Sequence, residues 1–169
     1  MQTARQRRLV IFLIILGMVE FTYGWLFLYG IRIVLLRSND MATYRMDVQG
    51  ATNIAGTQVQ LMRDVDGANQ AFHIQYVGDD QYKIGYGNEE LCIAVASDKE
   101  TVVIQGYDSE NEYNKWNISR IGTTQNYLFT NVATGNTLCY EYSSELASYR
   151  LYVKEYDEAS ENFAFFLVR

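Results

Sequence analysis

The stretch GTQVQLMRDVDGANQAFHI, residues 56–74, decides the fold because its plan occurs twice more in the chain. Residues 100–118 read ETVVIQGYDSENEYNKWNI, and residues 149–167 read YRLYVKEYDEASENFAFFL. Each stretch has an alternating apolar run, an acidic turn and then an aromatic residue that opens a second run. A matching short run lies upstream of each stretch, and its first residues, Tyr44, Leu91 and Leu138, are 47 positions apart. Three repeats of this length fill residues 31–168.

The runs within these repeats have the alternation of β-strands rather than the periodicity of helices. Examples are residues 31–33, 59–61, 82–84, 102–104 and 151–153, and Gly, Asn and Asp clusters separate them. We therefore predict an all-β domain of about twelve strands.

Three aromatic residues, Phe72, Trp116 and Phe165, have equivalent places in the repeats. One repeat cannot bury its own aromatic and aliphatic side chains, whereas three repeats around an axis enclose a common core and close a barrel without free edges. We expect these three rings to fill that core. We also expect the last strand, residues 165–168, to pair with the first, residues 31–36.

This arrangement resembles the ricin-B-type β-trefoil, in which each of three repeats ends in a Gln-x-aromatic motif. The motif is degenerate here and reads Gln70-Ala71-Phe72, Asn114-Lys115-Trp116 and Phe163-Ala164-Phe165. The resemblance covers residues 31–168, and we assign residues 31–169 to a ricin-B-like β-trefoil domain.

The resemblance implies a carbohydrate site in the first repeat. Lectins of this family hold a sugar between an acid, a polar residue and an aromatic on the next hairpin, and amides before the motif aromatic. The matching residues here are Asp47, Gln60, Met62, Asn69 and Gln70. Met62 replaces the stacking aromatic, so we expect a weak site. The alternative is that these polar side chains only brace their own hairpin and turn.

The other two repeats depart further from the lectin pattern. The second repeat has Ala94 in place of the acid, so we expect no sugar site there. The third repeat supplies a possible second site, with Glu141 as the acid, Tyr152 and Lys154 on the hairpin, and Asn162 before the motif.

Composition excludes several classes of function. Three of the 14 basic and one of the 20 acidic residues precede residue 31, which leaves a balance of −8 for residues 31–169. Such an acidic domain repels phosphate backbones, so we expect no nucleic-acid partner. One His and two Cys make a metal site or a His-based catalytic dyad hard to build, and we predict no cofactor, no metal and no enzyme activity. Cys92 and Cys139 have equivalent places in two repeats, too far apart for a disulfide, and we expect free thiols.

Residues 1–30 read as a membrane anchor or a signal segment. The run from Leu9 to Ile31 has 14 Leu, Ile, Val or Phe residues and one charge, Glu20. Those apolar residues contribute roughly −6 kcal/mol to insertion, against about +3 kcal/mol for a central acid, so a hydrophobic helix that contacts lipid through residues 9–31 is expected. Three Arg residues precede it, which predicts a cytoplasmic N-terminus. Cleavage after a shorter apolar region, giving a secreted protein, is the alternative.

Two hypotheses for function follow. The first is a non-catalytic lectin-like module on the outer or lumenal side of a membrane, a location with which the glycosylation sequon at Asn117 is compatible. The second is a structural or assembly subunit of a membrane complex, in which Glu20 meets a polar partner on another helix.

Overall fold

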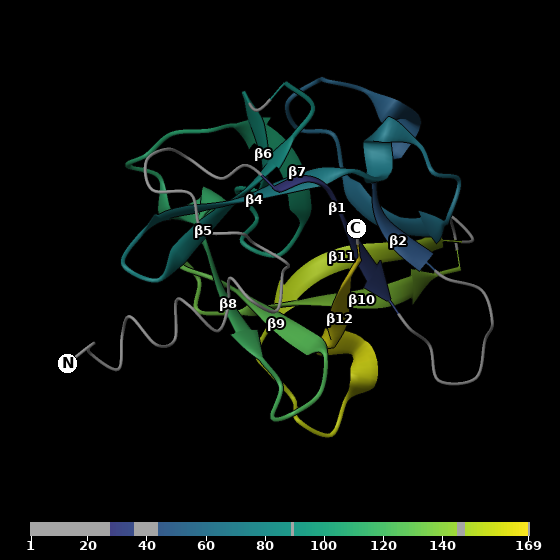
Figure 1. The fold of residues 1–169 in the computed structure, drawn as a ribbon, viewed down its shortest axis with the longest axis vertical. Helices are drawn as coiled ribbons and strands as arrows, with labels where there is room; N and C mark the ends of the chain where they lie inside the picture. Colours follow the sequence, from purple (N-terminus) through teal and green to yellow (C-terminus); the bar gives the residue numbers. More distant parts are fainter. Residues whose placement is uncertain (1–27, 36–43, 89, 145–147, 169) are drawn as a thin grey trace.

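The computed structural model describes residues 28–35, 44–88, 90–144 and 148–168, which form twelve β-strands and four single-turn 3₁₀ helices (Figure 1). The elements are β1 (Leu28–Leu35), β2 (Tyr44–Val48), η1 (Gln49–Ala51), β3 (Val59–Arg63), η2 (Ala68–Gln70), β4 (Phe72–Gly78), β5 (Gln81–Tyr86), β6 (Leu91–Val95), β7 (Val102–Gly106), η3 (Glu112–Asn114), β8 (Trp116–Arg120), β9 (Asn126–Asn131), β10 (Thr137–Ser143), β11 (Ser148–Lys154), η4 (Glu161–Phe163) and β12 (Phe165–Val168). This is the predicted all-β architecture.

Most of the predicted N-terminal segment, Glu20 included, lies outside the described residues. Residues 28–31 of that segment belong to strand β1 and not to a helix. The domain thus begins three residues earlier than expected. Within the described ranges, no helix is long and apolar enough to cross a bilayer.

Six strands close a barrel through an unbroken ring of antiparallel pairs. Strand β1 pairs with β4 and β12, β5 pairs with β4 and β8, and β9 pairs with β8 and β12. Ile33 faces Leu167 across β1 and β12, which confirms the predicted pairing of the first and last strands. The other six strands form three hairpins, β2–β3, β6–β7 and β10–β11, one for each repeat. A closed ring leaves its own strands with no free edge.

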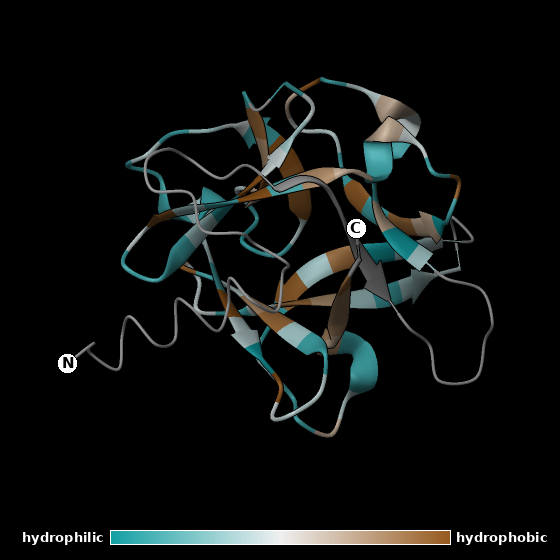
Figure 2. Cartoon of the chain, in the orientation of Figure 1, coloured by the Kyte–Doolittle hydropathy of each residue, from teal (hydrophilic) through white to brown (hydrophobic). Residues whose placement is uncertain are grey.

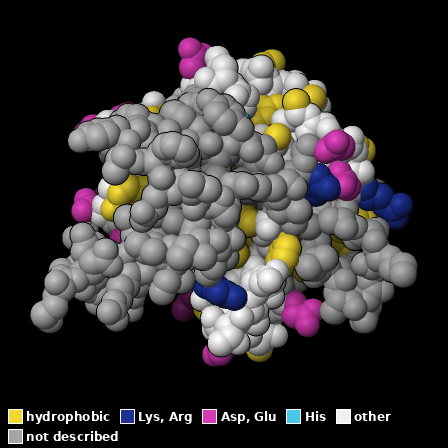
Figure 3. Space-filling view, in the orientation of Figure 1, with side chains coloured by type: hydrophobic (Ala, Val, Ile, Leu, Met, Phe, Trp, Pro, Cys, Tyr) yellow, Lys and Arg dark blue, Asp and Glu magenta, His cyan; other side chains and the backbone are white. Residues whose placement is uncertain are grey.

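The three motif aromatics fill the centre of the fold, as predicted. Phe72, Trp116 and Phe165 are each 0% exposed and belong to one apolar cluster. The indole N–H of Trp116 donates to the Ile93 carbonyl at 3.0 Å, so its single polar group is satisfied in the core. Figure 2 shows brown apolar segments on the strands and teal polar segments on most loops. On the face drawn in Figure 3, described acidic and basic side chains are interspersed.

Strand pairing defines which residues are equivalent in the three hairpins. Asp47 faces Gln60, Ala94 faces Val103, and Glu141 faces Arg150. From these partners to the motif positions, the chain runs 10 residues to Gln70, 11 to Asn114 and 13 to Phe163. The second and third repeats therefore carry short insertions after the hairpin. The sequence alignment above, which had no gaps, did not include these insertions.

Both cysteines lie in equivalent strands, β6 and β10. Cys92 and Cys139 are free and buried, as predicted. Burial raises the pKa of the Cys92 thiol to about 12 and that of Cys139 to about 11, so both stay protonated at neutral pH.

Candidate functional site

The first-repeat residues come together around one carboxylate. Asp47 is on β2, and its Oδ1 accepts from Gln60 Nε2 on β3 at 3.2 Å. Its Oδ2 accepts from Asn69 Nδ2 at 2.6 Å and from Gln70 Nε2 at 3.1 Å, both supplied by η2. Three of the five predicted first-site residues thus donate a hydrogen bond to a fourth, Asp47.

Gln70 also fixes the turn that leads into its own motif. Its Nε2 donates to the Arg63 carbonyl at 3.0 Å, and its Oε1 accepts from the backbone N–H of Val65 at 3.1 Å. Gln70 is fully buried and Asp47 is 3% exposed. This geometry fits the bracing role that was the alternative to sugar binding.

Burial also sets the protonation of Asp47. Loss of solvent raises the pKa of this carboxyl, and the hydrogen bonds from Gln60, Gln70 and Asn69 oppose that rise without cancelling it. A carboxylate has about four lone-pair sites, and three are occupied here.

Met62, the fifth predicted residue, lies further along the outer side of the same hairpin. It faces Arg45 across β2 and β3 and is 42% exposed. Arg45 forms ion pairs with Asp64 and, at 3.9 Å, with Asp66. Met62 therefore borders a charged turn and does not touch the carboxylate in any described hydrogen bond.

The second repeat has the motif amide but no acid for it. Asn114 is fully buried, and its Nδ2 donates to the Asp108 carbonyl at 3.1 Å. Its Oδ1 has no hydrogen-bond partner among the described residues. Ala94, at the place of Asp47, is buried too and offers no side-chain hydrogen bond.

The third repeat has an open version of the same position. Glu141 Oε1 accepts from Lys154 Nζ at 2.6 Å, and both side chains are about half exposed, at 50% and 43%. Lys154 also lies 5.7 Å from the ring centroid of Tyr152. Phe163 replaces the motif amide, so its side chain donates no hydrogen bond to the acid. Lys154 is the donor to Glu141 instead.

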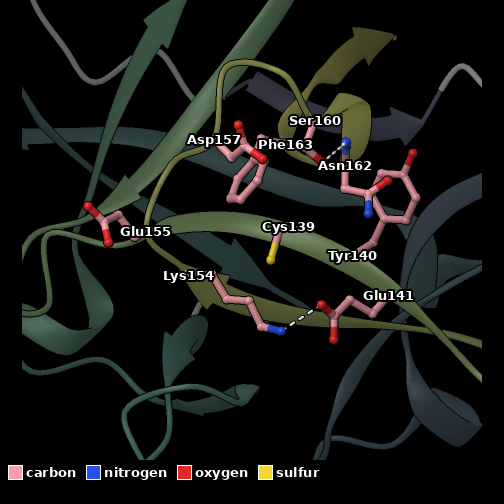
Figure 4. A pocket seen from close by; sticks show the side chains of 9 residues that line it. All are labelled: Cys139, Tyr140, Glu141, Lys154, Glu155, Asp157, Ser160, Asn162 and Phe163. Carbon is pink, nitrogen blue, oxygen red and sulfur yellow. Dashed lines mark hydrogen bonds and ion pairs between the residues drawn. The ribbon is translucent and has the colours of Figure 1, made fainter.

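A cavity of about 260 Å³ lies beside this ion pair. Its lining is Cys139, Tyr140 and Glu141 of β10, Lys154 at the end of β11, Glu155, Asp157 and Ser160 of the following loop, and Asn162 and Phe163 of η4. Figure 4 shows Lys154 and Glu141 along one side, Asp157 and Asn162 along the other, and Cys139 between them. Three of the four predicted residues of the second site, Glu141, Lys154 and Asn162, line this cavity, while Tyr152 lies outside it, opposite Cys139 on β11.

Polar groups in this cavity are available to a ligand. Among the described residues, Glu141 Oε2 and the side-chain amide of Asn162 have no hydrogen-bond partner, whereas the equivalent Asp47 and Asn69 bind each other. Pockets for drug-sized molecules span about 300–1,000 Å³, so this smaller volume suits a single sugar ring.

Some residues of this region were not found from the sequence. Arg150 occupies the place of Gln60, because it faces Glu141 across its hairpin as Gln60 faces Asp47. Asp157 and Ser160 line the cavity from the loop before η4, which is longer than its counterparts in the first two repeats. A single sequence does not show which residues of two repeats are equivalent once the loop between their strands changes length. These positions were therefore missed.

No group of three or more His, Cys, Asp or Glu side chains is placed to hold a metal ion within the described ranges.

Comparison with known proteins supports a ricin-B-type β-trefoil lectin-like domain. Residues 68–150 match the sequence profile described as ricin-type β-trefoil lectin domain-like. No curated protein gives a significant match to the chain.

Solved structures share the fold at low sequence identity. A designed threefold symmetric protein, ThreeFoil, has a TM-score of 0.71 at 19% identity, over 83% of this chain and 99% of that one. A Polyporus squamosus lectin, solved with a sialylated human-type influenza-binding epitope, has a TM-score of 0.63 at 17% identity, over 86% of this chain and 50% of that one. The cytolethal distending toxin from Actinobacillus actinomycetemcomitans has a TM-score of 0.67 at 9% identity, over 82% of this chain and 90% of that one. At these identities, the likeness shows the fold alone.

Proposed function

We propose that this protein is a non-catalytic carbohydrate-binding module and that its third repeat holds the sugar. The observation that carries the proposal is the cavity beside Glu141 and Lys154, whose polar groups remain partly unpaired. The lectin-like profile over residues 68–150 supports the ligand class.

Five of the lining residues have a defined role in this proposal. Glu141 accepts hydrogen bonds from sugar hydroxyls, Lys154 donates to a ring or hydroxyl oxygen, and the Asn162 amide does both. Phe163 and Tyr140 supply apolar area for the carbon face of the ring. Binding of this kind neither forms nor breaks a covalent bond.

A glycan array followed by calorimetry on the full chain tests the proposal. Because residues 9–31 are largely apolar, the chain should be kept in a detergent without a sugar headgroup, which would otherwise compete. Glu141→Gln should lower the affinity for any glycan that binds by about tenfold or more, because it removes a charge-assisted hydrogen bond. Glu158→Gln, which changes an exposed acid outside the cavity lining, is the matched control. No glycan signal, or a signal indifferent to Glu141→Gln, would remove the third repeat from the proposal.

The first repeat remains a candidate second site. Its amides and carboxylate have the right chemistry, but a sugar must compete with Gln60, Asn69 and Gln70 for Asp47. If the first repeat binds instead, Asp47→Asn abolishes the glycan signal while Glu141→Gln leaves it intact.

A second candidate function is a structural or assembly subunit. The observation that favours it is the first-repeat cluster, in which the buried acid already accepts hydrogen bonds from one residue of β3 and two of η2. This candidate expects a stoichiometric partner after extraction in mild detergent and no glycan signal.

We also propose that the apolar run before β1, residues 9–27, anchors the domain on the outer or lumenal side of a membrane. N-terminal sequencing of the mature protein tests this against cleavage, and protease protection of the intact membrane fraction tests the orientation.

A further inference from the structure

The charges around the third-repeat cavity point to a particular class of sugar. Three of its lining residues are acidic, namely Glu141, Glu155 and Asp157, and one is basic, Lys154. Lys154 is already paired with Glu141 at 2.6 Å, so its charge is largely neutralised. The cavity is left with a net charge of −2 and no unpaired cation in its lining.

Asp157 has an oxygen to spare on the side opposite the ion pair. Its Oδ1 accepts from the backbone N–H of Ala159 at 3.0 Å, and its second oxygen has no partner among the described residues. The Asn162 amide lies on the same side of the cavity (Figure 4). A ligand that presents hydroxyls to Glu141 and Asn162 can thus present a cationic group to Asp157.

We propose that the cavity prefers a sugar with a free ammonium group, such as glucosamine, over the neutral and acidic sugars of the same size. This inference rests on the proposed carbohydrate binding, and it adds the charge of the ligand. An ammonium gains attraction from Asp157 and Glu155, whereas a carboxylate on the sugar is repelled by both.

Calorimetry on the full chain should compare glucosamine, N-acetylglucosamine, glucose and glucuronate, with ethanolamine as a non-sugar amine. Glucosamine should bind about fivefold more tightly than glucose at low salt, because one charge pair at about 4 Å in a water-exposed site has that magnitude. Added salt should shrink the difference, since screening acts on this term alone.

Asp157→Asn separates the charge effect from sugar binding itself. It should bring the affinities for glucosamine and glucose close together, chiefly by weakening the binding of glucosamine, and Glu158→Gln should retain the preference. Equal affinity for the two sugars in the wild-type chain overturns this inference and leaves the proposed function standing. Binding of ethanolamine as tight as that of glucosamine overturns it too, because the cavity would then recognise the ammonium group without the sugar. Absence of binding by every sugar removes the proposed function and this inference together.

Discussion

Asp47 and Glu141 occupy the same position in two repeats, and their carboxylates have opposite surroundings. Asp47 is 3% exposed and accepts from three amides, whereas Glu141 is half exposed and pairs with one ammonium. The sequence indicated which side chains lie around Asp47, because their types and spacing match a known motif, and their role in sugar binding stays a prediction. It could not predict whether that cluster is closed on itself, since closure depends on rotamers and on how η2 packs over β2.

Asp47→Ala should destabilise the fold by about 2–4 kcal/mol, because it leaves three amide groups without their charged acceptor in a buried position. Glu141→Ala, the matched change in the third repeat, should cost less than about 1 kcal/mol, as expected for an exposed ion pair. Urea denaturation of both variants gives the comparison. Equal losses of stability would show that burial does not set the strength of these clusters.

The raised pKa of Asp47 has a defined effect on stability. Because the folded-state pKa is above the unfolded value of 3.8, the folded protein binds more protons between these two pKa values. The contribution of Asp47 to the free energy of unfolding therefore falls as pH rises from 3.8 through the folded pKa, and it is constant above that.

Denaturation of the wild type and of Asp47→Asn across this window checks the sign. The stability difference, wild type minus variant, should decrease as pH rises from 3.8 and then level off. A difference that grows with pH would mean that the three amides, rather than burial, dominate the pKa of Asp47.

At the scale of elements, the hairpin between β4 and β5 has a turn whose second residue, Asp80, does not suit its backbone. Asp79 and Asp80 both have positive φ, 48° and 59°, between the paired Gly78 and Gln81. A two-residue turn with both residues in the left-handed region prefers Asn-Gly. Replacing Asp79→Asn together with Asp80→Gly should raise the free energy of unfolding by about 0.5–1 kcal/mol.

Asp79→Asn with Asp80→Ala is the control for that turn. It removes the same two charges, but Ala keeps the steric cost of the left-handed region. Thermal denaturation should show a gain for the Asn-Gly pair only. A similar gain for Asn-Ala would assign the effect to charge repulsion between the two aspartates.

Elements were predictable to different degrees for a physical reason. Strands such as β3 and β11 contain the expected alternating runs because each buries alternate residues in the common core. Strands β5 and β7 bury consecutive residues, and their short apolar runs still marked them as strands. The loop before η4, residues 155–160, was not predictable, because one or two extra residues on the surface cost little and leave no periodic signal. Those residues build the cavity, so the candidate site was only partly predicted, whereas the strands were predicted well.

At the scale of the whole molecule, the closed barrel ties the two ends of the domain together. Strand β1 pairs with β12 through Ile33 and Leu167 and with β4 through Leu28 and Ile74. Every repeat contributes one of the three buried rings. No repeat can therefore unfold without exposing the core of the other two, and one cooperative transition is expected.

A comparison of chains beginning at residues 28 and 31 tests this closure. The longer chain retains the Leu28 to Ile74 pairing of β1 and β4, and the shorter one loses it. We expect the shorter chain to be less stable by about 1–2 kcal/mol, from lost backbone hydrogen bonds at the seam of the barrel.

Both chains lack Trp25, so the fluorescence of Trp116, which lies at the core, reports unfolding alone. Urea transitions followed by Trp116 fluorescence and by circular dichroism should coincide in each chain, with equal slopes and a lower midpoint for the shorter one. Equal midpoints would mean that residues 28–30 do not help to close the barrel, and separate transitions would contradict a core shared by the three repeats.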